Sequence, residues 1–144
     1  MTCENYNLVK KLLKKVDNDF KPPLSSILDI DEYSKKIILK STLFTRVKEG
    51  ELIGLCAIYI TDKESCQAYL TMLAVDPIFR GLGLAKGLIA EMEFYVLRQG
   101  LTSIKLEVHK NNPGAFSMYR GLGYEIIEES STSYFLQKKL SRDI

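Results

Sequence analysis

Asp76-Pro77-Ile78-Phe79-Arg80-Gly81-Leu82-Gly83-Leu84-Ala85-Lys86 is the segment that decides the fold, because two different sequence patterns meet there. Before it, residues 68–75 form a nearly unbroken apolar run, which predicts a strand buried on both faces at the centre of a sheet. After it, apolar side chains recur at helical spacing over residues 84–99, and Gly100 is a natural stop. The segment is therefore predicted to join a central strand to a long helix.

A junction of this kind can bind an anion. The first amides of a helix have no acceptor within the helix, and the helix dipole adds positive potential at the same place. Gly81 and Gly83 let an anion approach the backbone, Ala85 is the next small residue, and Arg80 and Lys86 can add charge. These features predict a pyrophosphate site; the alternative is a glycine-rich turn with only a structural role.

Two other phosphate-binding loops do not fit this segment. A P-loop requires a Lys followed by Ser or Thr after its last glycine, and no such pair is present. A dinucleotide-binding loop requires the spacing GxGxxG, whereas Gly81, Gly83 and Gly87 are spaced GxGxxxG. A general nucleotide-binding fold is therefore the weakest alternative.

Composition narrows the class of protein. With 144 residues, 46% hydrophobic and 26% charged, the chain is expected to form one domain over residues 1–144. A net charge of +2 is too small to indicate nucleic-acid binding, and no apolar run approaches the roughly 20 residues of a membrane span. The first residues lack a signal-peptide pattern, so we expect a cytoplasmic location. Three cysteines without CxxC spacing and a single His favour free thiols and no metal site.

The other segments complete an α/β (α+β) pattern. Before the central strand we expect an amphipathic helix over residues 6–16 with its lysines on a solvated face, a loop over 20–26 and a helix capped by Asp29. Strands over 43–47 and 52–59 and a polar loop over 61–65 should follow. After the long helix we expect a half-exposed strand over 104–108, a helix opened by Asn112 and Pro113, and final strands over 124–127 and 134–140. This order predicts a mixed, mostly antiparallel central sheet flanked by helices. The crossover from the central strand to the next strand should form a parallel pair.

Two motifs resemble the GNAT superfamily of acetyl-CoA-dependent N-acetyltransferases. Residues 80–85 match the family's signature Q/R-x-x-G-x-G/A, and residues 112–124 resemble its run NxxAxxxYxxxGF. The motifs occur in the family's order and at a normal separation, and the resemblance is strong over residues 52–124. It departs from the family at the start, where the helical pattern begins almost at Met1 and leaves the usual first strand short or missing.

The resemblance implies a GNAT-type acyl-CoA N-acyltransferase fold and a function. The chain would transfer the acetyl group of acetyl-CoA to a primary amine, on a small molecule such as an amino sugar or metabolite, by direct attack in a ternary complex. Tyr119 would donate a proton to the departing thiolate. The coenzyme would be held by Leu73, Ala74 and Val75 along its pantetheine arm, by Arg80, Gly81, Leu82, Gly83, Leu84, Ala85 and Lys86 at its pyrophosphate, and by Asn112.

The general base and the acceptor stay open at this level. The central strand carries no carboxylate, so the alternative bases are Glu107, His109 and a water chain that ends at a backbone carbonyl or at Tyr69. The acceptor would lie among residues 20–26, Tyr33, Tyr59 and residues 130–134. A protein amine as acceptor, a catalytically silent acetyl-CoA-binding module and a homodimer are further possibilities that the resemblance leaves open.

Overall fold

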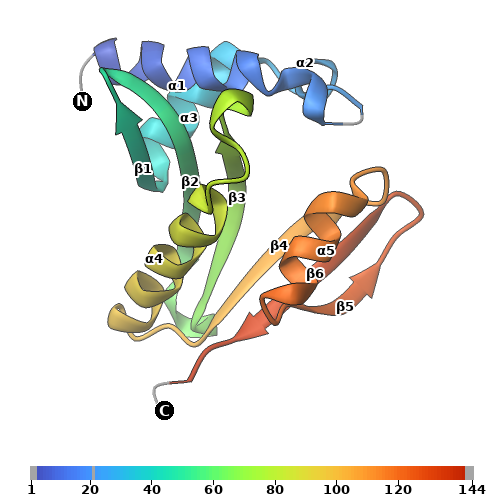
Figure 1. Cartoon of the computed structure of the whole chain (residues 1–144). Coiled ribbons are helices and arrows are strands. Elements are labelled where there is room, and N and C mark those ends of the chain that lie inside the picture. The colour runs from blue at the N-terminus through green and yellow to red at the C-terminus, as the bar shows by residue number, and fades with distance from the viewer. Residues whose placement is uncertain (1–2, 21, 142–144) are drawn as a thin grey trace.

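A six-stranded sheet forms the centre of the molecule, in a computed structural model that describes residues 3–20 and 22–141 (Figure 1). Its strand order is β1-β2-β3-β4-β6-β5. The strands are β1 (Thr42–Lys48), β2 (Glu51–Asp62), β3 (Gln67–Val75), β4 (Ser103–His109), β5 (Glu125–Glu129) and β6 (Ser133–Lys139). Every neighbouring pair is antiparallel except β3 and β4, which are parallel. The predicted mixed, mostly antiparallel sheet is confirmed.

Helices cover both faces of this sheet. They are α1 (Cys3–Lys15), α2 (Leu24–Ile27), α3 (Ile30–Lys40), α4 (Leu84–Arg98) and α5 (Pro113–Gly121), with short 3₁₀ turns η1 (Asp17–Asp19), η2 (Lys63–Ser65) and η3 (Pro77–Phe79). Leu55 and Ala57 of β2 pack in one core with α1 and α3, whereas Cys56 and Ile58 pack in a second core with α4 and α5. Since alternate residues of a strand face opposite sides, the two cores lie on opposite faces of the sheet. No helix in the described part of the chain is long and apolar enough to span a membrane.

The predicted helix starts are confirmed by their caps. Asp29 accepts a hydrogen bond from the Glu32 N–H (3.1 Å), and Asn112 accepts one from the Ala115 N–H (3.2 Å). In both cases the side chain satisfies an amide that has no acceptor within the helix. Pro113 stands in the first turn of α5, where its missing N–H costs nothing.

Two predicted loops are shorter than expected. Residues 24–26, placed in a loop with Pro22 and Pro23, belong to α2, because Pro23 takes the extended conformation of an N-cap and the helix starts directly after it. The polar loop predicted over residues 61–65 is wrong as well. Strand β2 continues to Asp62, which pairs with Gln67 of β3, and η2 then closes the hairpin.

The start of the sheet agrees with the departure from the family pattern. Within the described residues no strand precedes α1, so the sheet begins with β1.

The strands β3 and β4 separate half-way along their length. They pair only from Gln67–Ser103 to Leu70–Leu106, and beyond these pairs they diverge (Figure 1). On the other side of β3, Leu70 pairs with Ile58 but Met72 pairs with Ala57, which leaves Thr71 as an extra residue. Such a bulge bends a strand and increases its twist. The end of β3 therefore turns away from β4, and the sheet opens.

The opening corrects one expectation about β3. The strand was predicted to be buried on both faces, but its residues alternate between buried and half-buried. Residues 69–75, buried and half-buried alike, line the space between the two strands. An apolar strand thus looks the same in sequence whether protein or an open cleft lies beside it.

Candidate active site

A cleft of about 1110 Å³ fills the space between the diverging strands. It is bordered by the end of β3, the loop before α4, the end of β4, α5, and the segment from the end of α1 to α2. Eleven of the twelve predicted site residues line it: Leu73, Ala74, Val75, Arg80, Gly81, Gly83, Leu84, Ala85, Lys86, Asn112 and Tyr119. Leu82 does not; its side chain is 70% exposed to solvent.

The start of α4 offers a row of backbone amides to this cleft. The Gly87 N–H donates to the Gly83 carbonyl (3.0 Å), which is the first bond of the helix, so the amides of residues 81–86 precede the helical ladder. Gly81 and Gly83 both have φ of +81°, a left-handed conformation that other residues rarely adopt. A Cβ atom added to either glycine would meet no protein atom within 4 Å. The space beside them is therefore open to a ligand.

The two basic residues of the loop differ in their surroundings. The Arg80 guanidinium donates to the Val75 carbonyl through Nε (3.3 Å) and Nη2 (3.2 Å), and it forms an ion pair with Asp19. Its charge is thus partly offset, which limits the contribution predicted for it at an anion site. Lys86 is exposed at the cleft and forms no ion pair with the described residues. It can give its full charge to a bound anion.

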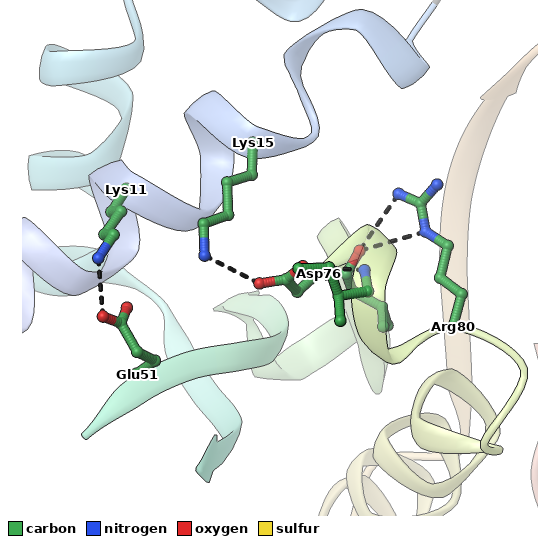
Figure 2. Close-up of polar contacts among 7 residues, drawn as sticks. Lys11, Lys15, Glu51, Asp76 and Arg80 are labelled. Atoms are coloured by element: carbon green, nitrogen blue, oxygen red, sulfur yellow. Dashed lines mark hydrogen bonds and ion pairs between the residues drawn. The ribbon is translucent and has the colours of Figure 1, made fainter. Parts of the chain in front are cut away.

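Asp76, the first residue after β3, is almost fully buried, with 2% of its surface exposed. Figure 2 shows its carboxylate facing Lys15 of α1, with 2.9 Å between Oδ2 and Nζ. The other oxygen, Oδ1, accepts from the Ile78 N–H (3.0 Å). Burial alone would raise the pKa of Asp76, but the hydrogen bonds from Lys15 and Ile78 and the nearby positive charges outweigh it and hold that pKa below its ordinary value.

The lysines of α1 are therefore more than a solvated face. Lys10 pairs with Asp31, Lys11 with Glu51, and Lys15 with Asp76. The first two pairs are exposed or nearly so, and pairs of that kind stabilise a fold by little. The third reaches a buried carboxylate and corrects the prediction at that position.

Tyr119 lies on α5 beside the cleft, 7% exposed. Its ring packs edge-on against Tyr124, with 5.6 Å between the ring centroids. The Tyr124 hydroxyl donates to Glu93 (2.9 Å), whereas the hydroxyl of Tyr119 has no hydrogen-bond partner among the described residues. Burial raises the pKa of the Tyr119 phenol, so the group keeps its proton and can donate it. Tyr124, and not Tyr119, is the core tyrosine with a satisfied hydroxyl.

Glu107 and His109, the two alternative bases on β4, both line the cleft. Glu107 is exposed, and its Oε2 accepts from the hydroxyl of the buried Ser133 (2.7 Å), which fixes the carboxylate. The Nδ1 of His109 is buried and has no partner among the described residues. Tyr69 also lines the cleft, but burial, with the charge of Glu107, raises the pKa of its phenol, so it is a poor proton acceptor.

Part of the predicted acceptor region lies at the cleft. Phe20, Pro22, Leu24 and Tyr33 line it, and sequence reasoning missed Ile27 of α2 and Leu28 directly after it, which carry no motif. The Tyr33 hydroxyl donates to the Thr71 carbonyl (3.2 Å), which ties α3 to the bulge in β3. This end of the cleft is mostly apolar.

Tyr59 and residues 130–134, also predicted for the acceptor region, do not line the cleft. The Tyr59 ring lies under Lys36 of α3, 5.7 Å from its Nζ, and its hydroxyl is buried. Tyr134 packs on Phe116 with ring centroids 4.7 Å apart. Ser133 contributes only indirectly, through its bond to Glu107.

Cys56 is fully buried in the same core as Tyr119, and burial raises the pKa of its thiol to about 12. A rise of that size lowers the thiolate fraction at pH 8 roughly 1000-fold, and the thiolate is the species that reacts. We expect iodoacetamide at pH 8 to label the half-buried Cys66 of the native protein and to leave Cys56 unmodified, as measured by peptide mass spectrometry. Both residues should be labelled in urea; labelling of Cys56 in the native protein would contradict its burial.

The residues that form the cleft belong to a stretch of sequence that matches a known protein family. Residues 9–124 match the model described as the acetyltransferase (GNAT) family. This chain belongs to the GNAT acetyltransferase family. The resemblance seen in the two motifs is thereby confirmed.

Two curated relatives match this chain over part of their own length. The N-alpha-acetyltransferase MAK3 of Arabidopsis thaliana is 26% identical over 115 residues, which are 78% of this chain and 58% of that protein. Acetyltransferase ECA0875 of Pectobacterium atrosepticum is 38% identical over 56 residues, 39% of this chain and 40% of that protein. The chain thus spans between 40% and 58% of the length of these two curated relatives.

A solved GNAT structure shows the same fold. The PaiA N-acetyltransferase of Thermoplasma acidophilum, crystallised in complex with coenzyme A, superimposes with a TM-score of 0.78 at 19% identity. The match covers 96% of this chain and 95% of that one.

Proposed function

We propose that this chain is an acetyltransferase domain that transfers the acetyl group of acetyl-CoA to a primary amine, on a small molecule. The observation that carries the proposal is one cleft lined by the residues before α4, by the end of β3 and by Tyr119, whose hydroxyl has no hydrogen-bond partner among the described residues. The structurally similar PaiA N-acetyltransferase, crystallised with coenzyme A, supports the choice of coenzyme. The reaction needs an anion site, an extended channel and a proton donor, and the cleft offers one of each.

The coenzyme would lie along the opening of the sheet. Its diphosphate would bind the amides of residues 81–86 with Lys86 beside them. Its pantetheine arm would follow Leu73, Ala74 and Val75, where β3 has no β4 partner; the Val75 carbonyl is already used by Arg80.

Asn112 would add a side-chain contact to the coenzyme. Its Oδ1 caps α5, which leaves its amide nitrogen as the group that can donate.

The chemistry follows from the groups around the thioester. A neutral amine attacks the thioester carbon, and a backbone N–H of β3 stabilises the oxyanion that forms. The C–S bond then breaks, and Tyr119 gives its proton to the departing thiolate of coenzyme A. Direct attack is favoured over an acetylated cysteine, because Cys56 does not line the cleft and its raised pKa makes it a weak nucleophile.

Glu107 is our proposal for the general base. It is the cleft-lining carboxylate that remains available, since Asp19 pairs with Arg80, and Ser133 holds it in place. Replacing Glu107 with Gln keeps the shape but removes the proton acceptor, so we expect kcat to fall about 10- to 100-fold while the Kd for coenzyme A stays unchanged. Glu128→Gln, an exposed residue of β5, is the matched control. If the Glu107→Gln variant keeps the wild-type kcat, the general base is His109 or water instead.

A protein N-terminus is the second acceptor class that an observation favours. The relative from Arabidopsis is named an N-alpha-acetyltransferase, and the apolar wall of Phe20, Leu24 and Ile27 suits a non-polar side chain next to the reacting amine. A panel of amino sugars, metabolite amines and short peptides with free or blocked N-termini, read by the release of coenzyme A thiol, separates the two classes. If no amine releases thiol although coenzyme A raises the melting temperature, the chain is a silent coenzyme-binding module instead.

A further inference from the structure

The segment from the last turn of α1 to η1 contacts the coenzyme loop at both of its ends. At the first end, Lys15 Nζ lies 2.9 Å from Oδ2 of Asp76, directly after β3. At the second end, Asp19 of η1 forms an ion pair with Arg80 (Figure 2 shows Lys15, Asp76 and Arg80). Lys15 and Asp76 are 61 positions apart in the sequence, so this contact is purely tertiary.

Asp76 connects this clamp to the backbone of the loop. Its own N–H donates to the Ile53 carbonyl of β2 (2.8 Å), and its Oδ1 accepts from the Ile78 N–H (3.0 Å). Two of its polar groups thus fix the turn into η3, and the remaining oxygen is bound by Lys15. The Arg80 side chain, at the far end of the turn, donates to the Val75 carbonyl, so both ends of the turn are bound to the end of β3.

The burial of Asp76 makes this arrangement depend on Lys15. The Asp76 side chain is 3% exposed, whereas that of Lys15 is 36% exposed. A buried carboxylate that loses its hydrogen-bonded partner is strongly unfavourable, and the Arg80 guanidinium, which is near enough to help lower the pKa of Asp76, donates instead to the Val75 carbonyl and to Asp19. Without the Lys15 ammonium, the carboxylate would have to turn toward solvent, and the turn that it fixes would move with it.

We propose that Lys15 is a positioning residue for the coenzyme: through Asp76, it holds the loop of residues 76–83 in the conformation whose amides bind the diphosphate. The inference rests on the coenzyme site of the proposed function and extends that site to α1, which lies outside both sequence motifs. Lys15 itself does not line the cleft.

A role of Lys15 through charge alone or through stability alone would give different results. If Lys15 acted only as a distant positive charge, removing the negative charge of Asp76 would tighten the binding of an anionic coenzyme. If it acted only on global stability, every coenzyme fragment and every comparable ion pair of α1 would respond alike. The Lys11–Glu51 pair, one turn earlier on the same helix, lies close enough to feel the charges of Lys15 and Asp76 but forms no hydrogen bond with the loop, so it is the matched control (Figure 2).

The test compares the Kd of coenzyme A, measured by calorimetry, in wild type, Lys15→Met, Asp76→Asn and the double variant. We expect each single variant to bind about 10-fold more weakly, and the double variant about as weakly as either one, because both break the same contact. Lys15→Arg, which keeps the charge, should bind within about 3-fold of wild type, and Lys11→Met and Glu51→Gln within about 2-fold. Tighter binding by Asp76→Asn, or equal losses in the control pair, would overturn the proposal.

A donor without the diphosphate separates positioning from general damage. The kcat/KM for S-acetylpantetheine should change less than about 2-fold in Lys15→Met, while that for acetyl-CoA falls about 10-fold. Equal losses with both donors would mean that Lys15 is merely structural. If wild type binds coenzyme A but acetylates no amine, the proposed function fails while the calorimetric comparison still decides the role of Lys15. If wild type does not bind coenzyme A, both are wrong.

Discussion

Replacing Tyr119 with Phe should lower kcat about 100-fold and leave the Kd for coenzyme A within about 2-fold of wild type. The substitution removes one hydroxyl, which has no hydrogen-bond partner among the described residues. Without it, the thiolate of coenzyme A must leave without a proton donor, so the loss falls on the chemical step. Steady-state kinetics with saturating acceptor and calorimetry with coenzyme A measure the two quantities.

Tyr124 provides the matched control for this experiment. Its ring packs against that of Tyr119, but its hydroxyl donates to Glu93, which also binds Lys138 (3.0 Å). We expect Tyr124→Phe to lower the free energy of unfolding by about 1 kcal/mol while kcat changes less than about 2-fold. If Tyr119→Phe instead behaves like Tyr124→Phe, with a stability loss and normal turnover, the proton-donor role of Tyr119 is refuted.

Replacing Gly83 with Ala should weaken the binding of coenzyme A by about 30-fold or more, because a methyl group would occupy the space where the diphosphate approaches the amides. The protein itself leaves this space open, since a Cβ at Gly83 would meet no atom within 4 Å. The left-handed φ of +81° adds a strain of roughly 1–2 kcal/mol to the folded state. Calorimetry and thermal unfolding measure the affinity and the strain separately.

Gly100, at the other end of α4, allows the two effects to be distinguished. It also has φ of +81° and no neighbour within 4 Å of an added Cβ, but it does not line the cleft. Gly100→Ala should therefore carry a similar stability loss with wild-type affinity for coenzyme A. Similar affinities in the two variants would indicate that the glycine turn is only structural and that the diphosphate binds elsewhere.

Most of the candidate site could be predicted from local sequence patterns. The loop before α4, the caps at Asp29 and Asn112 and the position of Tyr119 each depend on residues within a few positions of one another. Helix starts, glycine turns and alternation are properties of such short segments, so they can be recognised without tertiary information.

Contacts between distant segments were the part that sequence could not supply. Lys15 has the same helical spacing as the exposed lysines of α1, and only the folded chain brings it to Asp76. Likewise, Tyr59 has the residue type of an acceptor contact but lies under α3, while Ile27 and Leu28 reach the cleft without any motif. The bulge at Thr71, which opens the sheet, is a property of strand register and leaves no mark in the apolar run.

The four residue pairs that join β3 to β4 leave two strand edges facing each other inside one molecule. Unpaired edges are usually a liability, because another extended chain can add to them and start aggregation. Here an extended ligand that lies along the free edge of β3 can form backbone hydrogen bonds that β4 does not provide. Amide hydrogen exchange of residues 71–75 should therefore slow when such a ligand is present, and the shelf life of the purified protein should depend on whether it is stored with one.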